Sequence, residues 1–314
     1  MCEYGVIENT DGKTGEKTEE KTAVIEIAKA AGLTLLSEEE RNPLYTTTYG
    51  VGEVIKDAVR NGCRKFIVGI GGSATNDGGA GMLQALGFGL LKENGEQIPI
   101  GARGLEELAE ITDDNVIPEL AECKFKIACD VTNVLCGETG ASAVYGPQKG
   151  ADEEMTERLD RLLFSYASLV KKKIPKADSM YPGTGAAGGL GFAFLTFMDA
   201  QLESGIQIVI KETGLEQEIA KADLVITGEG RMDGQTAMGK APIGIAKIAK
   251  KYGKPVIAFA GAAARDAGAC NEQGIDAFFP ILREAVSLEA AMKRENAEAN
   301  MEAAVEQAYR LWRL

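Results

Sequence analysis

Hydrophobic positions along the chain fall into two patterns. Short continuous apolar runs bounded by Gly, Asn or charged residues predict buried strands at residues 65–70, 125–131, 206–210, 222–230, 254–261 and 276–282. Apolar residues that recur every three or four positions predict helices at residues 50–63, 80–87, 152–173, 190–203, 214–221, 242–252 and 288–312. Residues 22–33 predict a strand that passes into a helix, and residues 88–98 predict a hairpin that turns at Asn94-Gly95. The polar residues 1–21 are expected to form a hairpin tip or a loose end.

The alternation of apolar strands with amphipathic helices indicates an α/β fold, in which helices cover both faces of parallel sheets. A chain of 314 residues is long for a single core, so we expect two domains. Folds of this class bind ligands at the carboxyl ends of their strands. The segments that follow residues 70, 129 and 227 are therefore the first candidates for chemistry.

Composition narrows the possible functions. The net charge of −13 argues against nonspecific binding of nucleic acids or anionic membranes, because both need a basic face. The chain has no histidine, which excludes Ser-His-Asp and Cys-His catalysis, so acid–base work falls to Asp, Glu, Lys or Tyr. The six cysteines form no C-x-x-C motif and are expected to be reduced core residues. The N-terminal residues are polar and no apolar run approaches ~20 residues, so we expect a cytoplasmic protein without a membrane partner.

Glycine is unusually frequent, with 38 residues, and one glycine-rich turn follows the strand predicted at 65–70. This turn, Gly69–Ala74, fits the dinucleotide fingerprint G-x-G-x-x-A. The fingerprint also requires an acidic partner at the end of a second strand, and the nearest candidate, Glu93, sits in the predicted hairpin. A polar cluster follows just ahead of the next helix: Ser73, Thr75, Asn76 and Asp77. The cluster could cap that helix, or it could hold an oxyanion or a metal-bound phosphate with backbone N–H groups.

Three further loops carry candidate groups. The stretch Cys129–Asn133 places Asp130 at a strand end, where a carboxylate can activate a hydroxyl, hold Mg²⁺ or form an Asx-turn. The loop Tyr145–Ala151 offers Lys149, which could meet an anion or be solvated. The glycine loop Gly183–Gly191 opens a helix, but no Lys-Ser or Lys-Thr follows it, so it is not a P-loop.

The densest polar loop, Thr227–Pro242, follows a predicted buried strand. Its polar side chains lie within a dozen residues: Glu229, Arg231, Asp233, Gln235, Thr236 and Lys240. This mixture of cations and carboxylates suits phosphoryl transfer, in which positioning and charge neutralisation do most of the work. A salt-bridged surface loop would have the same composition, so the residues alone leave both interpretations open.

Taken in order, these stretches resemble the bacterial glycerate kinase family. The matching stretches are NPLYTTTYGVGE, IGGSATNDGGAGMLQALG, CDVTN, YGPQKGA (with Tyr145 in place of a Phe), GAAGGLG and TGEGRMDGQT…GKAPIGIA. The resemblance runs from about Thr22 to the C-terminus. Two family motifs, Pro-Asp-Ser-Phe-Lys and Asp-Gly-Gly-Glu-Gly, do not occur. We therefore expect a chain that enters the family pattern partway and lacks the family's N-terminal segment.

The resemblance implies ATP-dependent phosphorylation of glycerate to 2-phosphoglycerate, with ATP and Mg²⁺ as cofactors and homo-oligomerisation left open. It implies two α/β domains with the active site in the cleft between them. The Rossmann-like parallel-sheet domain would comprise residues 116–180 and 216–314, and the second α/β domain would comprise residues 22–115 and 181–215. Two alternatives stay open. One is a non-catalytic or split kinase remnant that needs the N-terminal segment, and the other is an NAD(P)-dependent oxidoreductase.

The motifs and the resemblance together give a set of candidate site residues. The catalytic candidates are Asp130, Arg231, Asp233 and Lys240, with Lys149 as a further anion ligand. The candidate cofactor-binding residues are Gly71, Gly72, Ser73, Thr75, Asn76, Gly188, Gly189 and Glu229, and the candidate metal ligands are Asp77, Asp130 and Asp233. Asp130 or Asp233 would orient or deprotonate the attacking hydroxyl or bind Mg²⁺, and the sequence does not separate these roles.

Overall fold

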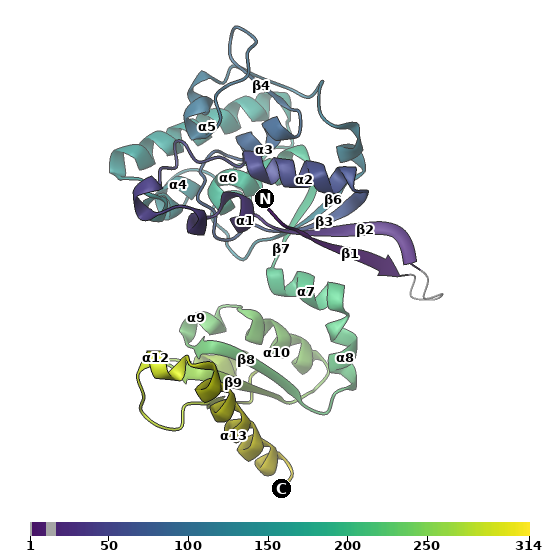
Figure 1. Ribbon diagram of the computed structural model, residues 1–314, viewed down its shortest axis with the longest axis vertical. Helices are drawn as coiled ribbons and strands as arrows, with labels where there is room; N and C mark the ends of the chain where they lie inside the picture. Colours follow the sequence, from purple (N-terminus) through teal and green to yellow (C-terminus); the bar gives the residue numbers. More distant parts are fainter. Residues whose placement is uncertain (1, 11–16) are drawn as a thin grey trace. The chain divides into compact units, whose positions relative to one another are not determined.

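The structure is a computed structural model that describes residues 2–10 and 17–314 of the chain (Figure 1). Contacts between residues divide the chain into two compact units, residues 1–205 and residues 206–314. Each unit is a layered α/β structure with its own sheet and its own hydrophobic core.

The first unit is built on a five-stranded sheet with the strand order β1-β2-β3-β6-β7. The strands are Gly5–Thr10 (β1), Lys17–Glu26 (β2), Cys63–Gly69 (β3), Lys124–Ala128 (β6) and Asp199–Glu203 (β7). β1 and β2 pair antiparallel, and they form the hairpin expected near the N-terminus, although residues 11–16 lie outside the described part of the chain. β2, β3, β6 and β7 run parallel. The carboxyl ends of β3 and β6 therefore meet, with Gly69 paired to Ala128.

Helices pack on this sheet (Figure 1). They span Ala28–Ala31 (α1), Tyr49–Arg60 (α2), Ala80–Ala85 (α3), Ala141–Tyr145 (α4), Glu153–Lys173 (α5) and Ala186–Phe197 (α6). Short 3₁₀ helices occupy Leu33–Leu35, Glu38–Glu40, Ala102–Glu107, Pro118–Glu122 and Pro147–Lys149. In α2 the apolar spacing places Val51, Val54, Ile55, Ala58 and Val59 in the core. This confirms the helix predicted at 50–63, which ends before Gly62 in the left-handed region (φ +86°).

Aromatic rings tie the helices of the first unit to the sheet. Phe66 of β3 and Phe125 of β6 stack with ring centroids 4.6 Å apart, and Phe194 of α6 lies 5.6 Å from Phe125. Tyr166 of α5 meets Phe192 of α6 edge to face at 5.8 Å. All five side chains are buried, and each such ring removes a large apolar area from water. This packing fixes the position of the loops at the carboxyl ends of β3 and β6.

The second unit contains the three-stranded parallel sheet β10-β9-β8. Its strands are Val225–Met232 (β8), Val256–Ala263 (β9) and Ala277–Pro280 (β10). Its helices are Gly205–Thr213 (α7), Leu215–Lys221 (α8), Gly234–Ala237 (α9), Ala241–Lys251 (α10), Ala269–Glu272 (α11), Leu288–Ala291 (α12) and Arg294–Trp312 (α13). Ile243 and Ala246 of α10 pack with Val256 and Ala258 of β9 on one face of the sheet. On the other face, Phe259 and Phe279 stack beside Ala308 of α13.

Three element predictions were wrong. Residues 206–210, predicted as a strand, belong to helix α7, where Ile208 and Ile210 are buried. Residues 199–203, predicted as the end of a helix, form the edge strand β7, whose backbone pairs with β6. The helix predicted at 288–312 is broken into α12 and α13 around Met292 and Lys293. In the first two cases, helix packing and strand pairing overrode a local preference.

Two smaller predictions differ from the structure in detail. The turn at Asn94-Gly95 forms, with Gly95 donating to the Lys92 carbonyl at 3.0 Å, but the regular partner of β4 (Gly89–Leu91) is β5 (Glu110–Thr112). Residues 116–180, which the sequence analysis grouped with residues 216–314, lie in the first unit because β6 pairs with β3. Among the described residues, no helix is both long and apolar enough to cross a membrane.

Candidate functional site

A cavity of about 270 Å³ lies at the carboxyl ends of β3 and β6 in the first unit. The end of β6 and the loops that follow the two strands supply part of its lining, and the end of α4, the 3₁₀ helix Pro147–Lys149 and the start of α6 supply the rest. Its chemistry-bearing lining residues are Ser73, Cys129, Asp130, Tyr145, Gln148 and Lys149, together with the backbone of Gly71 and Gly72. Ser73, Asp130 and the two glycines were all predicted as site residues, and the structure brings them together.

The turn after β3 is not a dinucleotide-binding turn. Gly72 is left-handed (φ +71°), and its carbonyl accepts from the N–H of Leu33 at 2.9 Å. In the dinucleotide fingerprint a helix opens directly at the third small residue. Here residues 74–79 are non-helical and α3 begins only at Ala80. The oxidoreductase alternative therefore loses the local geometry on which it depends.

Lys149 is the buried cation of this cavity, since its side chain is only 2% exposed. Its Nζ donates to Ser73 Oγ at 3.0 Å and to the Thr75 carbonyl at 2.6 Å. Burial lowers the pKa of Lys149 to about 8, and the charge of Asp77 opposes this shift. Lys149 thus links the two predicted motifs GGSAT and GPQKG in one buried cluster.

Asp77, a predicted metal ligand, lies in the protein interior and is absent from the cavity lining. Its carboxylate accepts from the Thr48 N–H at 2.8 Å, from the Thr48 hydroxyl at 3.0 Å and from the N–H groups of Gly79 and Gly81. Burial raises the pKa of Asp77, while these hydrogen bonds oppose the shift. The contacts connect the start of α2 to the start of α3, so Asp77 organises the loop behind the cavity.

The loop behind the cavity is also held in place by three other predicted site residues, Asn76, Gly188 and Gly189. Asn76 is buried and donates to Ser142 Oγ at 2.9 Å. Gly188 and Gly189 are left-handed (φ +65° and +92°), and the Gly188 carbonyl accepts from the N–H of Gly78 at 2.9 Å. A side chain at Gly188 would overlap the carbonyl oxygen of Thr75. The two glycines thus allow the second glycine loop to lie directly on the first.

Asp130 follows β6 and is exposed at the cavity, where its Oδ1 accepts from the N–H of Gly205 at 3.1 Å. Sequence reasoning missed two neighbours as site residues. Tyr145 donates to Asn133 Oδ1 at 2.6 Å, and the Cys129 thiol donates to the Val131 carbonyl at 3.3 Å. Both belong to motifs quoted above, CDVTN and YGPQKGA, but only the structure shows that they line one cavity.

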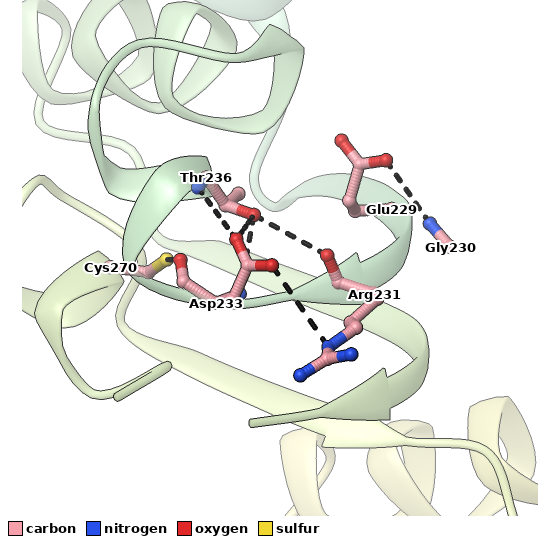
Figure 2. Close-up of polar contacts among 6 residues, drawn as sticks. All are labelled: Glu229, Gly230, Arg231, Asp233, Thr236 and Cys270. Atoms are coloured by element: carbon pink, nitrogen blue, oxygen red, sulfur yellow. Dashed lines mark hydrogen bonds and ion pairs between the residues drawn. The ribbon is translucent and has the colours of Figure 1, made fainter. Parts of the chain in front are cut away.

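The second unit carries the other predicted cluster, at the carboxyl end of β8 (Figure 2). Asp233 caps α9, accepting from the Thr236 N–H at 3.0 Å, and the Thr236 hydroxyl accepts in return from the Asp233 N–H at 3.3 Å. Arg231 Nε lies 4.0 Å from Asp233 Oδ2. The Thr236 hydrogen bonds lower the pKa of Asp233, and the nearby Lys240 and Arg231 lower it further. Asp233 is therefore a carboxylate that stays ionised well below neutral pH.

Two more predicted residues flank this carboxylate. Lys240 occupies the N-cap position of α10 and is exposed, as is Arg231. Glu229 is half-buried and accepts through Oε1 from the N–H of Gly230 at 3.2 Å. The segment thus presents two exposed cations beside a hydrogen-bonded carboxylate, and Arg231 forms one long ion pair of 4.0 Å with that carboxylate.

The described residues contain no group of three or more Asp, Glu, Cys or His side chains that could hold a metal ion. Magnesium sites in phosphoryl-transfer enzymes use one or two carboxylates together with substrate phosphates and water, so they do not need such a group. Asp130 and Asp233 each offer a carboxylate with an oxygen that makes no short hydrogen bond.

Comparison with protein-family models matches residues 3–313 to the model described as the glycerate kinase family. The chain belongs to the glycerate kinase family. A glycerate kinase of Halalkalibacterium halodurans is 48% identical over 287 residues, which cover 91% of this chain and 76% of the relative. A glycerate 2-kinase of Escherichia coli is 48% identical over 286 residues, which cover 91% of this chain and 75% of the relative.

A solved structure supports the same assignment. The crystal structure of a Salmonella typhimurium LT2 protein assigned as glycerate kinase 2 matches with a TM-score of 0.81 and 44% identity, covering 98% of this chain and 82% of that one. Membership of the glycerate kinase family makes the chain a kinase, and it confirms the resemblance carried by the motifs. The structural match confirms the α/β fold class with parallel sheets.

Proposed function

We propose that this chain transfers a phosphoryl group from ATP to the 2-hydroxyl group of glycerate and releases 2-phosphoglycerate. The family assignment and the printed names of relatives at 48% identity support glycerate as the acceptor, and the name glycerate 2-kinase supports the position of transfer. The observation that carries the proposal is the mixed-charge segment Arg231–Lys240, which begins in the last residues of β8, in a chain of this family.

The loop has the groups that phosphoryl transfer requires. The transferring group spreads negative charge over its oxygens, and fixed cations stabilise that charge without reorganisation. Arg231 and Lys240 are such cations, in a protein whose net charge of −13 otherwise repels anions. We assign Arg231 and Lys240 to the phosphates of the nucleotide.

The residues fit Mg²⁺ with ATP. Asp233 has a lowered pKa, which makes its carboxylate a poor proton acceptor at neutral pH and a suitable ligand for a hard cation. Bound Mg²⁺ would neutralise phosphate charge during transfer. We therefore assign Asp233 to the metal and Asp130, which lines the cavity of the first unit, to orienting the attacking hydroxyl.

Thermal stability with nucleotides tests this function against its alternatives. A ligand that binds the folded chain raises its melting temperature in proportion to the logarithm of concentration over Kd. We expect ATP-Mg to raise the melting temperature and NAD(P)H to leave it unchanged, with ADP release in the presence of glycerate. Stabilisation by NAD(P)H alone would support an oxidoreductase. Binding of ATP-Mg without ADP release would support a non-catalytic remnant.

A further inference from the structure

The cavity of the first unit is small for a ligand-binding pocket. Pockets that enclose drug-sized ligands have volumes of about 300–1,000 Å³, whereas this one measures about 270 Å³. Its wall combines apolar residues such as Ile70 and Ala186 with a few polar groups. Such a space suits a three-carbon acid.

The single buried cation of its wall makes an anion the better ligand. Lys149 donates two of its three N–H bonds, both to neutral oxygens, those of Ser73 and Thr75. Within the described part of the chain, Lys149 makes no ion pair, and Asp77 acts on it only at longer range through its charge. An ammonium group buried without a carboxylate partner is costly, and an anion in the cavity would remove much of that cost.

The geometry points to this cavity as the acceptor subsite, in which Lys149 binds the carboxylate of glycerate. The assignment rests on the proposed function, because the family supplies glycerate as the acid. Asp130 at the same cavity then faces the hydroxyl groups of the bound acid, which can donate to it. Lys149 would thus bind the carboxylate end of the substrate, and Asp130 would accept hydrogen bonds from its hydroxyl end. Gly71, Gly72 and Ser73, which the sequence analysis assigned to the cofactor, would serve the acid.

The structure provides two independent ways to disable the cavity. Lys149→Met keeps the length of the side chain and removes the charge. Gly71→Leu adds a side chain at another lining position, because Gly71 is not left-handed and no atom lies within 4 Å of an added Cβ. Matched controls are Lys172→Met on the exposed surface of α5 and Gly268→Leu, whose added Cβ also meets open space.

The test measures binding of D-glycerate to the full chain by calorimetry without nucleotide, and turnover of D-glycerate and of its uncharged amide with ATP-Mg. We expect Lys149→Met to weaken glycerate binding by roughly 30-fold or more, since truncating one partner of a buried charge pair has about this effect. We expect Gly71→Leu to weaken it as well, because the added side chain occupies space at the cavity wall. The two control variants should bind as the wild type does. In Lys149→Met the preference for glycerate over the amide should disappear, which a purely structural lysine would not cause.

The outcomes separate this inference from the proposed function. Normal glycerate binding in both cavity variants, with turnover intact, overturns the acceptor subsite and leaves the kinase function standing. Glycerate binding that depends on Lys149, with no turnover in the wild type, supports the subsite and overturns the kinase function. If Lys149→Met does not fold, as judged by circular dichroism, glycerate binding by Gly71→Leu alone tests the subsite: weakened binding supports it and normal binding overturns it.

Discussion

At the residue scale, burial gives Lys149 a lower pKa in the folded chain than in the unfolded chain. The folded pKa is about 8, against 10.5 for a solvated lysine. Below pH 8 the side chain is charged in both states, and the folded state carries the full desolvation cost. Between pH 8 and 10.5 the folded chain binds fewer protons than the unfolded one, so the free energy of unfolding rises with pH.

This linkage gives a measurable slope. From pH 7.5 to 9.5 the contribution of Lys149 to the free energy of unfolding should increase by about 2 kcal/mol. Urea denaturation of the wild type and of Lys149→Met at both pH values checks this, because the variant should lack that part of the slope. Parallel pH dependences in the two proteins would show that Lys149 is not charged and buried.

Asp233 and Lys240 should matter for catalysis more than for folding. Asn is a good N-cap residue, so Asp233→Asn keeps the cap of α9 and loses the charge. Lys240→Ala removes one exposed cation. We expect each change to lower kcat/KM by roughly 100-fold or more with little change in melting temperature. Lys247→Ala, an exposed lysine on the same helix α10, is the control. Near-normal kcat/KM in both variants would place the chemistry outside this loop.

The candidate site was partly predictable from these residues. Ser73 and Asp130 follow buried strands, and the rule that ligands bind at carboxyl strand ends brings them together. Asp77 illustrates what the rule misses. Its hydrogen bonds come from Thr48, the N-cap residue of α2, which lies 29 residues earlier, and no local pattern encodes them. The burial of Lys149 likewise depends on contacts with residues more than seventy positions away.

At the element scale, the glycine loop at the start of α6 depends on backbone conformation. Ala187 is left-handed (φ +52°), as are Gly188 and Gly189. The left-handed conformation is unfavourable by about 1–2 kcal/mol for alanine, whereas glycine adopts it readily. Gly188→Ala would be destabilised by this backbone conformation and also by a steric overlap. Its Cβ would overlap the Thr75 carbonyl, which also accepts a hydrogen bond from Lys149.

The two neighbouring positions should therefore respond in opposite ways. We expect Gly188→Ala to lower the free energy of unfolding by more than about 2 kcal/mol and to weaken glycerate binding. Ala187→Gly should leave the free energy of unfolding unchanged or raise it. Chemical denaturation of both variants and of the wild type measures these free energies of unfolding. Equal stability of Gly188→Ala and the wild type would contradict the close packing of the two glycine loops.

Element types were predictable where local pattern and tertiary packing agree. The spacing in α2 and the Asp152 cap of α5 are examples, since Asp152 accepts from the Met155 N–H at 2.8 Å. The stretch Ile206–Ile210 shows the opposite case. Its β-branched residues favour a strand, but Ile206 packs on Gly244 of α10, where an added Cβ would lie 2.8 Å from Ile206. Helix–helix packing therefore set the conformation of α7.

At the scale of the whole molecule, we assign different ligands to the two units. Glycerate is assigned to the cavity of the first unit, and ATP-Mg is assigned to the loop after β8 in the second. The division at residue 205 could not be predicted from sequence, because the pairing of β6 with β3 joins segments sixty residues apart.

Hydrogen exchange with each ligand alone tests this division. We expect D-glycerate to slow exchange in peptides that cover residues 70–76, 128–133 and 145–151, because ordered ligand contacts suppress local opening. ATP-Mg should slow exchange in peptides that cover residues 227–242. Protection by glycerate confined to residues 227–242 would contradict the assignment of the two ligands.

Proton-coupled ³¹P NMR of the reaction mixture shows whether this chain phosphorylates the 2-hydroxyl group of glycerate. A phosphate on the second carbon couples to one hydrogen and gives a doublet, whereas a phosphate on the third carbon couples to two and gives a triplet. With ATP-Mg and D-glycerate, we predict a new doublet that grows as the ATP signals decline, and no new signal with Asp233→Asn over the same time. A triplet would contradict the position of transfer, and unchanged ATP signals with the wild type would contradict the kinase function of this chain.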